Sequence, residues 1–267
     1  MGRILQRAIE AGRQSALILI VMLFFIFGIA PLESFSLNPG EHIFNLSKIG
    51  DTRSFKLENN SLEPIAVEIY MKKRDMDIDG KEFNPEIDGE FLFYPEQVIL
   101  MPMESQIINV VWLGGVRTER ELAYRLYGEE LPLDLSEEED EDDDDKGVLG
   151  VNTKIRILLR YATSVYVTPK KTEEEVVVEE LKVHLNEEGV KQLMVTLYNK
   201  GSKHVFLSKN DLHIKDSRTG NNIYTSKDIK SFVHVNLLAG KKIRFFLEYP
   251  EGVKIRNLVA EFVTLKK

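Results

Sequence analysis

The sequence predicts an all-β protein made of two antiparallel β-sandwich domains. Three observations favour this class. Apolar and polar residues alternate in short runs that recur about every ten residues, the rhythm of sandwich strands. Gly, Pro, Asn and Asp separate the runs, and no helical periodicity is long enough to compete. The chain has 267 residues, enough for one large or two ordinary domains, and a polar hinge at residues 169–175 divides the pattern.

The N-terminus predicts export. Three arginines within the first 13 residues precede an apolar run at residues 16–30, and the small residues Gly28 and Ala30 fit a cleavage site. This arrangement is typical of a secretory signal peptide, here residues 1–30. Pro31 is unfavourable directly after such a site, which moves the expected cleavage a few residues on. The alternative is a retained membrane anchor, although the run is slightly shorter than the roughly 18–20 apolar residues of a spanning helix.

Alternation also defines the strands of the first half. In residues 65–71, for example, Ile65, Val67, Ile69 and Met71 share one face. Residues 73–89 are polar and contain Asp79-Gly80, a hairpin signal. The other predicted strands are residues 37–46 (a turn and then a strand), 52–59, 91–94, 97–101, 106–113 and 122–131.

A much longer strand is predicted at residues 148–169. Alternate residues from Leu149 to Val167 are apolar or threonine, while the opposite face is mostly polar. Ordinary strands have about five or six residues, so this apolar row should extend beyond the core of its own domain. We therefore expect something else to cover the surplus.

The second half restarts the strand rhythm and predicts a smaller β domain at residues 176–267. The residue pattern shows no repeat between the two halves. The predicted strands are residues 176–185, 192–199, 204–207, 212–215, 223–224, 232–238, 243–249 and 258–265.

An acidic loop at residues 136–147 joins the last two strands of the first half. Residues 137–145 are nine acids in a row, and removing their charge from the net −8 leaves +1. Like charges repel, so we expect a disordered, extended loop, with loose cation binding or shielding of the long strand as alternatives. It lacks the glycine and ligand spacing of a formed calcium loop. The near-neutral remainder shows no basic footprint for nucleic acid.

No residue pattern indicates catalysis, a cofactor or a metal site. The chain has no cysteine, which excludes disulfides, thiolate nucleophiles and cysteine-ligated metals. No Ser–His–Asp order or Gly-rich phosphate loop is present, and the histidines lack metal-ligand spacing. They are His42, His184, His204, His213 and His234.

Four segments, taken in order, resemble the PapD-like periplasmic chaperones of the chaperone–usher pathway. They are LNPGEHIF, YPEQVILMPMESQIINVVWLG, AYRLYGEELPL and TKIRILLRYATSVYVTP, within residues 36–169. The resemblance implies two immunoglobulin-like domains set at an angle, residues 36–169 and 176–267. It implies a periplasmic, non-enzymatic chaperone that binds pilus or fimbrial subunits by donor-strand complementation and delivers them to an outer-membrane usher.

The resemblance also assigns the long strand a role. Its first part would lend Leu149, Val151 and Ile155 to an incomplete subunit, each side chain contributing about 1.5–3 kcal/mol when buried. Strand addition of this kind is known in chaperone–pilin complexes. The side chains from Ile157 onward, namely Ile157, Leu159, Tyr161, Val165 and Val167, would fill the chaperone's own core. The alternative is that the whole row is core.

The family anchors the subunit's C-terminal carboxylate with two basic residues. Arg156 matches the family's lysine, and a guanidinium can grip a carboxylate through two hydrogen bonds. The second anchor falls near Glu41 or His42, neither of which substitutes well. Arg125 on the preceding strand could replace it, as could Arg160. The alternative is that these arginines are solvated cations on polar strand faces.

A different class of function remains open from the sequence. The chain could be an exported or membrane-anchored adhesive or structural surface protein with two immunoglobulin-like domains. In that case it would have no subunit or usher as partners, and it would contact the membrane through a retained N-terminal helix.

Overall fold

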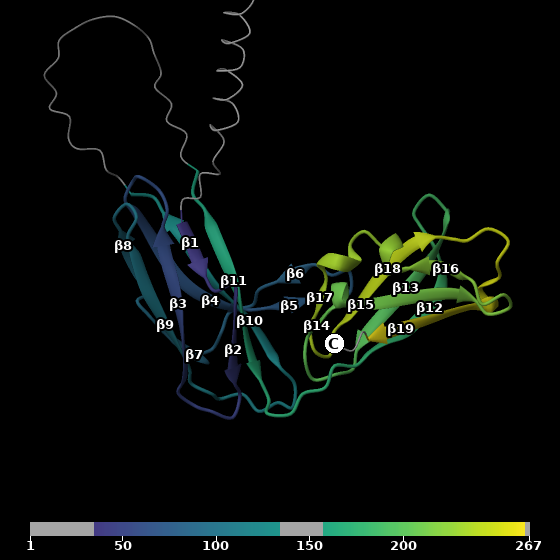
Figure 1. Cartoon of the computed structure of the whole chain (residues 1–267), viewed down its shortest axis with the longest axis horizontal. Coiled ribbons are helices and arrows are strands. Elements are labelled where there is room, and N and C mark those ends of the chain that lie inside the picture. Colours follow the sequence, from purple (N-terminus) through teal and green to yellow (C-terminus); the bar gives the residue numbers. More distant parts are fainter. Residues whose placement is uncertain (1–34, 134–156, 265–267) are drawn as a thin grey trace, which may run out of the picture.

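The computed structural model describes residues 35–133 and 157–264, which form two β-sandwich domains set at an angle (Figure 1). We call the described residues up to Thr168 domain 1 and those from Val176 domain 2. The predicted all-β, two-domain fold class is confirmed. The predicted signal peptide, the acidic loop and residues Leu149, Val151, Ile155 and Arg156 lie outside the described residues.

Domain 1 packs a four-stranded sheet against a five-stranded sheet. The four-stranded sheet has the order β1 (Phe35–Asn38), β3 (Asp51–Asn59), β9 (Ser105–Trp112), β7 (Phe91–Tyr94). The five-stranded sheet has the order β2 (Glu41–Asn45), β11 (Arg160–Thr168), β10 (Leu122–Leu131), β4 (Ile65–Lys73), β8 (Gln97–Leu100). Two of the passages from the first sheet to the second, β1 to β2 and β7 to β8, contain the cis peptide bonds before Pro39 and Pro95.

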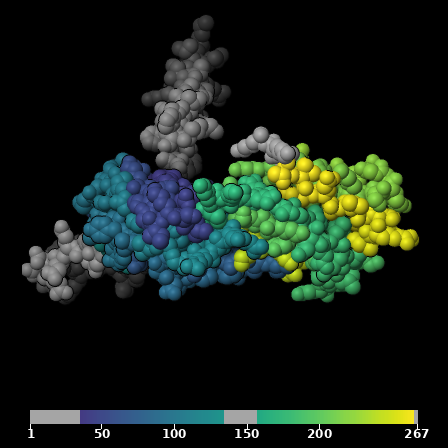
Figure 2. Space-filling model, turned by 90° about the horizontal axis from the view of Figure 1, so that it is seen from below, coloured from purple at the N-terminus to yellow at the C-terminus, as the bar shows by residue number. Residues whose placement is uncertain are grey.

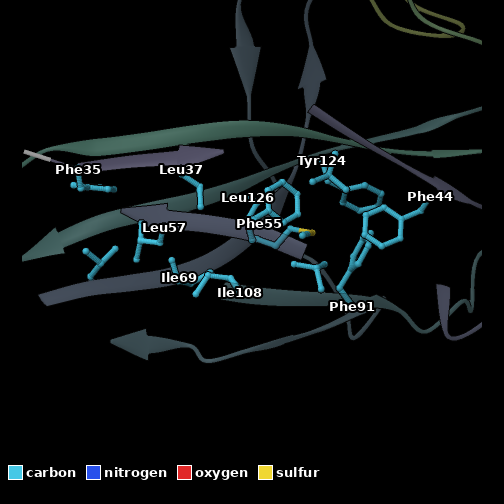
Figure 3. Packing of buried hydrophobic residues seen from close by; sticks show 14 of the residues in the cluster. Phe35, Leu37, Phe44, Phe55, Leu57, Ile69, Phe91, Ile108, Tyr124 and Leu126 are labelled. Carbon is cyan, nitrogen blue, oxygen red and sulfur yellow. The ribbon is translucent and has the colours of Figure 1, made fainter. Parts of the chain in front are cut away.

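The core of domain 1 lies between these sheets, where aromatic and aliphatic side chains interdigitate (Figure 3). The alternation of β4 is confirmed, because Ile65, Val67, Ile69 and Met71 are all at most 3% exposed. Phe91 packs edge-on against the rings of Phe44, Trp112 and Tyr124. These contacts tie both sheets together at the end of the domain near domain 2.

The row from Ile157 to Val167 is only partly core. Val165 and Val167 are fully buried, and Leu159 and Tyr161 pack partly against the core. The prediction that Ile157 fills the core is wrong, because its side chain is 74% exposed. The physical reason is length: β11 begins at Arg160, opposite Glu129, and Ile157 lies beyond the end of the packed sheets.

Domain 2 is built from smaller sheets. They have the orders β12 (Val176–Leu185), β13 (Lys191–Asn199), β18 (Lys242–Glu248); β16 (Asn222–Thr225), β15 (Asn210–Asp216), β19 (Leu258–Thr264); and β14 (Val205–Phe206), β17 (Asn236–Leu237). Four 3₁₀ turns complete it: η1 (Leu207–Lys209), η2 (Ser226–Asp228), η3 (Phe232–His234) and η4 (Ile255–Asn257). Among the described residues, no helix has the length and hydropathy that a membrane crossing needs.

The predicted strand at residues 232–238 is largely wrong. Its first half forms η3, and only Asn236 and Leu237 pair as a strand. Phe232, Leu237 and Leu238 are buried in the core while Val233 is 53% exposed, so the buried residues of this run belong to a turn and a short strand rather than to one alternating face.

Domain 1 also sends an arm toward domain 2. This arm is the hairpin of β5 (Asp75–Met76) and β6 (Glu82–Phe83), and the predicted turn at Asp79-Gly80 lies at its tip. Figure 1 shows the arm reaching from β4 to the sheets of domain 2, and Figure 2 shows the two domains as one elongated body.

Candidate functional site

Strand β11 has an edge that is only half covered. On one side β10 pairs with it from Arg160 to Val167. On the other side β2 runs parallel to it but pairs only with Ser164–Thr168. In the described part of the chain no strand pairs with residues 160–163 on that side. The backbone there offers N–H and C=O groups to an added strand.

Exposed apolar side chains stand at the head of this edge. Ile157 is 74% exposed and Leu158 is 45% exposed, immediately before β11 begins. Ile157 belongs to the same alternating row as the buried Val165 and Val167. The apolar row therefore does continue past the core, in the direction of the predicted donors Leu149, Val151 and Ile155.

Arg125 lies in the cleft between the domains, on β10 next to β11. Its Nε and Nη2 atoms donate to the two carboxylate oxygens of Glu82, both at 2.8 Å, and Nη1 donates to Ser164 Oγ at 2.8 Å. Glu82 comes from the arm, and Arg74 Nε also donates to it at 2.8 Å. A bidentate arginine–carboxylate pair is a strong, geometrically specific contact.

The titration of Glu82 reflects this pairing. Burial alone would raise the pKa of Glu82, but the hydrogen bond from Arg125 and the charges of Arg74 and Arg125 outweigh it. The pKa falls to about 2 as a result. Two arginines thus face one carboxylate, and the cluster keeps a positive charge at neutral pH.

The other predicted anchors are separated from this cluster. Arg160 is exposed, with its guanidinium 5.3 Å from the centre of the Tyr127 ring and 4.0 Å from Glu129. Glu41 lies opposite Ser164 on β2 and therefore brings a carboxylate, not a cation, to the edge of β11. Of the predicted carboxylate anchors, Arg125 and Arg160 are described, and each already faces a carboxylate, Glu82 and Glu129 respectively.

A cavity of about 380 Å³ opens beside this cluster, between the two domains. Domain 1 and its arm line it with Arg74, Glu82 and Arg125, and domain 2 with His234 and Asn236 among others. The hydroxyl of Tyr166 on β11 accepts hydrogen bonds from Arg74 Nη1 at 2.8 Å and from Asn236 Nδ2 at 2.7 Å. The cleft end of β11 is therefore held by both domains.

A buried pair that the sequence did not reveal joins the domains behind the cleft. Glu121 Oε1 accepts from the backbone N–H of His204 at 3.0 Å and contacts His204 Nδ1 at 2.5 Å. Thr168 Oγ1 donates to Glu121 Oε2 at 2.8 Å, and the His204 ring stacks on Tyr166 at 4.1 Å. The side chains of His204 and Glu121 are 5% and 2% exposed. No sequence signal links residues so far apart.

The arm makes a second junction. Ile78 C=O accepts from the backbone N–H of Arg244 on β18 at 2.8 Å, and Met76 packs into the core of domain 2. Asp79 pairs with Arg244, and Asp75 Oδ2 accepts from Lys241 Nζ at 2.8 Å. Contacts from both domains therefore hold the cleft and the adjacent end of β11 in place. Within the described ranges, no three histidine or acidic side chains are grouped as a metal-ligand set.

The fold places the chain among two-domain proteins of the immunoglobulin-like sandwich class. Among solved structures it is similar to a chain of the CsuC–CsuE chaperone–tip adhesion subunit complex from archaic chaperone–usher pili of Acinetobacter baumannii, with TM-score 0.54 and 15% identity over 83% of this chain and 91% of that one. It is also similar to the class 5 fimbriae chaperone CfaA, with TM-score 0.51 and 17% identity over 87% and 100% of the two chains.

A third similar chain comes from a chaperone–tip adhesin complex of CFA/I fimbriae biogenesis, with TM-score 0.51 and 18% identity over 86% of this chain and 99% of that one. The resemblance to PapD-like chaperones is thus confirmed at the level of the fold, across both domains. No protein-family model matches the chain. A comparison with curated proteins gave no match.

Proposed function

We propose that this chain is a periplasmic chaperone that stabilises pilus or fimbrial subunits and delivers them to an outer-membrane usher. The observation that carries the proposal is that the apolar row buried at Val165 and Val167 continues to an exposed Ile157, next to the uncovered edge of β11. The fold, shared with fimbrial chaperones, and the predicted signal peptide support it. The usher and the periplasmic location are inferred from this resemblance.

The mechanism is strand addition. The segment before β11 pairs with an incomplete subunit through backbone hydrogen bonds, and alternate side chains enter the groove where the subunit lacks a strand. Leu149, Val151 and Ile155 are the proposed donors, and Ile157 joins them because it continues their row. Each fully buried donor contributes about 1.5–3 kcal/mol.

The subunit's C-terminal carboxylate would then be received by a basic side chain. Arg156, the predicted direct grip, precedes the end of β11 that lies away from the cleft, so it would act beside the donor segment and not in the cleft. In the cleft itself Arg125 would have a supporting role, since its guanidinium already holds Glu82 and Ser164. The excess positive charge of Arg74 and Arg125 over Glu82 favours a carboxylate nearby.

The test is to purify the full chain from the periplasm of cells that produce it and to determine its bound partner by native mass spectrometry. Ile157→Asp and Leu149→Asp should abolish a one-to-one complex with a small secreted β-rich protein while the circular dichroism spectrum is unchanged. Ile49→Asp is the matched control, because Ile49 is also 74% exposed but lies in the loop between β2 and β3, near the Thr168 end of β11 and away from Ile157.

Two results would contradict the proposal. One is undiminished capture by both aspartate variants. The other is a chain that fractionates with membranes and carries no stoichiometric partner, which would instead support a surface protein of the same fold.

A further inference from the structure

The proposed donors belong to the inward-facing row of the five-stranded sheet. Leu149, Val151 and Ile155 have the same sequence parity as Val165 and Val167, whose buried side chains point toward the four-stranded sheet. A subunit whose groove accepts these donors therefore lies on the inner side of the sheet, beyond the point where the core ends. Such a subunit faces the loops that close domain 1 at the end where β11 begins.

Two loops close this end of domain 1. The loop at residues 60–64 joins β3 to β4, and the loop at residues 101–104 joins β8 to β9. The strands β4 and β8 pair beside these loops, Ile65 with Leu100. The end of β10 at Leu131 lies next to that pair, and β11 begins opposite the same end of β10. Both loops therefore share one end of the sandwich with the start of β11.

The two loops expose apolar side chains. Leu62 in the first loop is 88% exposed, and Met101 and Met103 in the second are 56% and 72% exposed. We call these three side chains the loop patch. Ile157 and Leu158 are exposed at the start of β11, at the same end of the domain. Apolar side chains gathered at one place mark an interaction surface, and the flexible thioether of methionine adapts well to a partner.

A single buried asparagine holds both loops in place. Asn59 Nδ2 donates to the carbonyl of Glu63 in the first loop at 2.8 Å and to that of Met101 in the second at 3.0 Å. Its Oδ1 accepts from the N–H of Ser61 at 2.9 Å, and Glu104 Oε2 accepts from the N–H of Met101 at 2.8 Å. The loop patch is thus carried by a fixed backbone, which lowers the entropy cost of binding a partner.

Met103 has a backbone conformation that its side chain does not favour. Its φ is +61°, and no other non-glycine residue among those described has a positive φ. It follows Pro102 in a turn that the N–H of Glu104 closes by donating to Met101 C=O at 3.0 Å. Glycine or asparagine is the usual residue at this position of such a turn. An exposed methionine here strains the backbone without filling the core, which points to a role in binding.

We infer that the loop patch is the docking surface for the body of the subunit that receives the donors. The inference rests on the proposed function. The loop before β9 follows β8, which lies three strands from β11, or about 14 Å at the usual strand spacing. A β domain of about 100 residues has a radius of gyration of about 13 Å, so its body spans this distance. The donors fill its groove, and the loop patch contacts the apolar surface beside the groove.

Site-specific photo-crosslinking in producing cells tests this inference. The full chain carries p-benzoylphenylalanine at one position: Val151 in the donor segment, Leu62 in the loop patch, or Ile49 as the control. Ile49 is also exposed, but it lies between β2 and β3, at the end of β3 away from Leu62. We expect Val151 and Leu62 to form adducts with the same protein, identified by mass spectrometry, and Ile49 to form none.

The strained residue gives a second readout. Met103→Gly removes the thioether and suits the positive φ, so the midpoint of thermal melting should stay the same or rise. The variant should nevertheless lower the yield of the Val151 adduct at least about threefold, and its combination with Leu62→Ser at least about tenfold. Ile49→Ser is the matched control and should leave the yield unchanged.

Each other outcome is decisive. If Val151 forms its adduct while Leu62 forms none, or while the loop variants leave the yield unchanged, the docking surface is wrong and the proposed function stands. A lower melting midpoint in Met103→Gly would assign Met103 a structural role and overturn the inference. A Leu62 adduct with a second copy of this chain would assign the patch to self-association, with the same consequence. If Val151 forms no adduct, strand addition fails and the inference fails with it.

Discussion

Each domain has a buried asparagine at the end of a strand whose side chain closes the following loop, but the two loops differ in what they contact. In domain 1, Asn59 ends β3, and its Nδ2 donates to the carbonyls of Glu63, Leu100 and Met101 at 2.8–3.2 Å. In domain 2, Asn199 ends β13, and its Nδ2 donates to the carbonyls of Lys203 and Leu237 at 2.8 and 3.0 Å. Each side-chain oxygen also accepts from the backbone N–H two residues further on. Both asparagines are at most 1% exposed.

The loops that follow these asparagines have different environments. After Asn59 the loop projects into solvent, where Leu62 is 88% exposed. After Asn199 the loop lies against domain 1: Ser202 C=O accepts from the N–H of Glu121 at 2.8 Å, and His204 contacts the Glu121 carboxylate. The same hydrogen-bonding pattern thus precedes a solvent-exposed loop in domain 1 and a loop in domain 2 that contacts domain 1. We call the contact of this second loop with Glu121 the joint, and the end of domain 1 at the exposed loop the free end. The proposed binding edge of β11 begins at the free end.

The largest effect is expected at the joint. His204→Ala removes the imidazole partner of the buried Glu121 carboxylate, which keeps the His204 backbone N–H and Thr168 as donors, and it also removes the ring stacked on Tyr166, so we expect a loss of about 3 kcal/mol in the free energy of unfolding. Urea titration of the full chain measures it, with the exposed His234→Ala as the control. A loss below about 1 kcal/mol would show that the joint is not a structural centre and would end the contrast between the two loops.

The two asparagines should be nearly equivalent. Asn59→Ala and Asn199→Ala each leave several buried backbone groups without partners, and we expect a loss of about 2–3 kcal/mol in either case. Asn109→Ala, at an exposed position of β9, is the control and should cost little. If Asn199→Ala lowered the free energy of unfolding and Asn59→Ala did not, the buried asparagine would matter only where its loop contacts the other domain.

The cleft should make stability depend on acid pH. Because the pKa of Glu82 is lowered from 4.5 to about 2, its pairing contributes fully above pH 4.5 and is lost as the pH falls through about 2. We expect a contribution of about 2 kcal/mol, which disappears over this window. Glu82→Gln should flatten the dependence measured by thermal melting, and Glu187→Gln, at an exposed turn, should not. An unchanged profile in Glu82→Gln would contradict the assigned pairing.

The smallest effect is expected at the tip of the arm. Asp79 and Arg244 form a largely exposed pair, with side chains 51% and 35% exposed. Asp79→Ala should therefore cost only about 0.5 kcal/mol by urea titration. A loss above about 2 kcal/mol would mean that this ion pair, and not the burial of Met76, holds the arm on domain 2.

The alternation of apolar and polar residues was sufficient to predict most strands, but it could not predict the contacts between the two domains. The bounds of β10 and the inner face of β4 follow from alternation, because one face of each strand meets a continuous core. Alternation could not show where the core ends, so Ile157 was placed inside it. The contacts of Arg125 with Glu82 and of Glu121 with His204 depend on the docking of distant segments, which no local spacing encodes. Arg125 was selected from the sequence, but its carboxylate partner was not.

The arm has a consequence for how this chain can be divided. Met76 and Ile78 belong to the first half of the sequence, yet they complete the core and the β18 edge of domain 2. Cutting the chain at the linker would give a domain 2 fragment that lacks the Met76 side chain in its core and has an unpaired edge at β18. Because the arm precedes domain 2 in the sequence, it is synthesised first, and domain 2 completes its core by packing onto it.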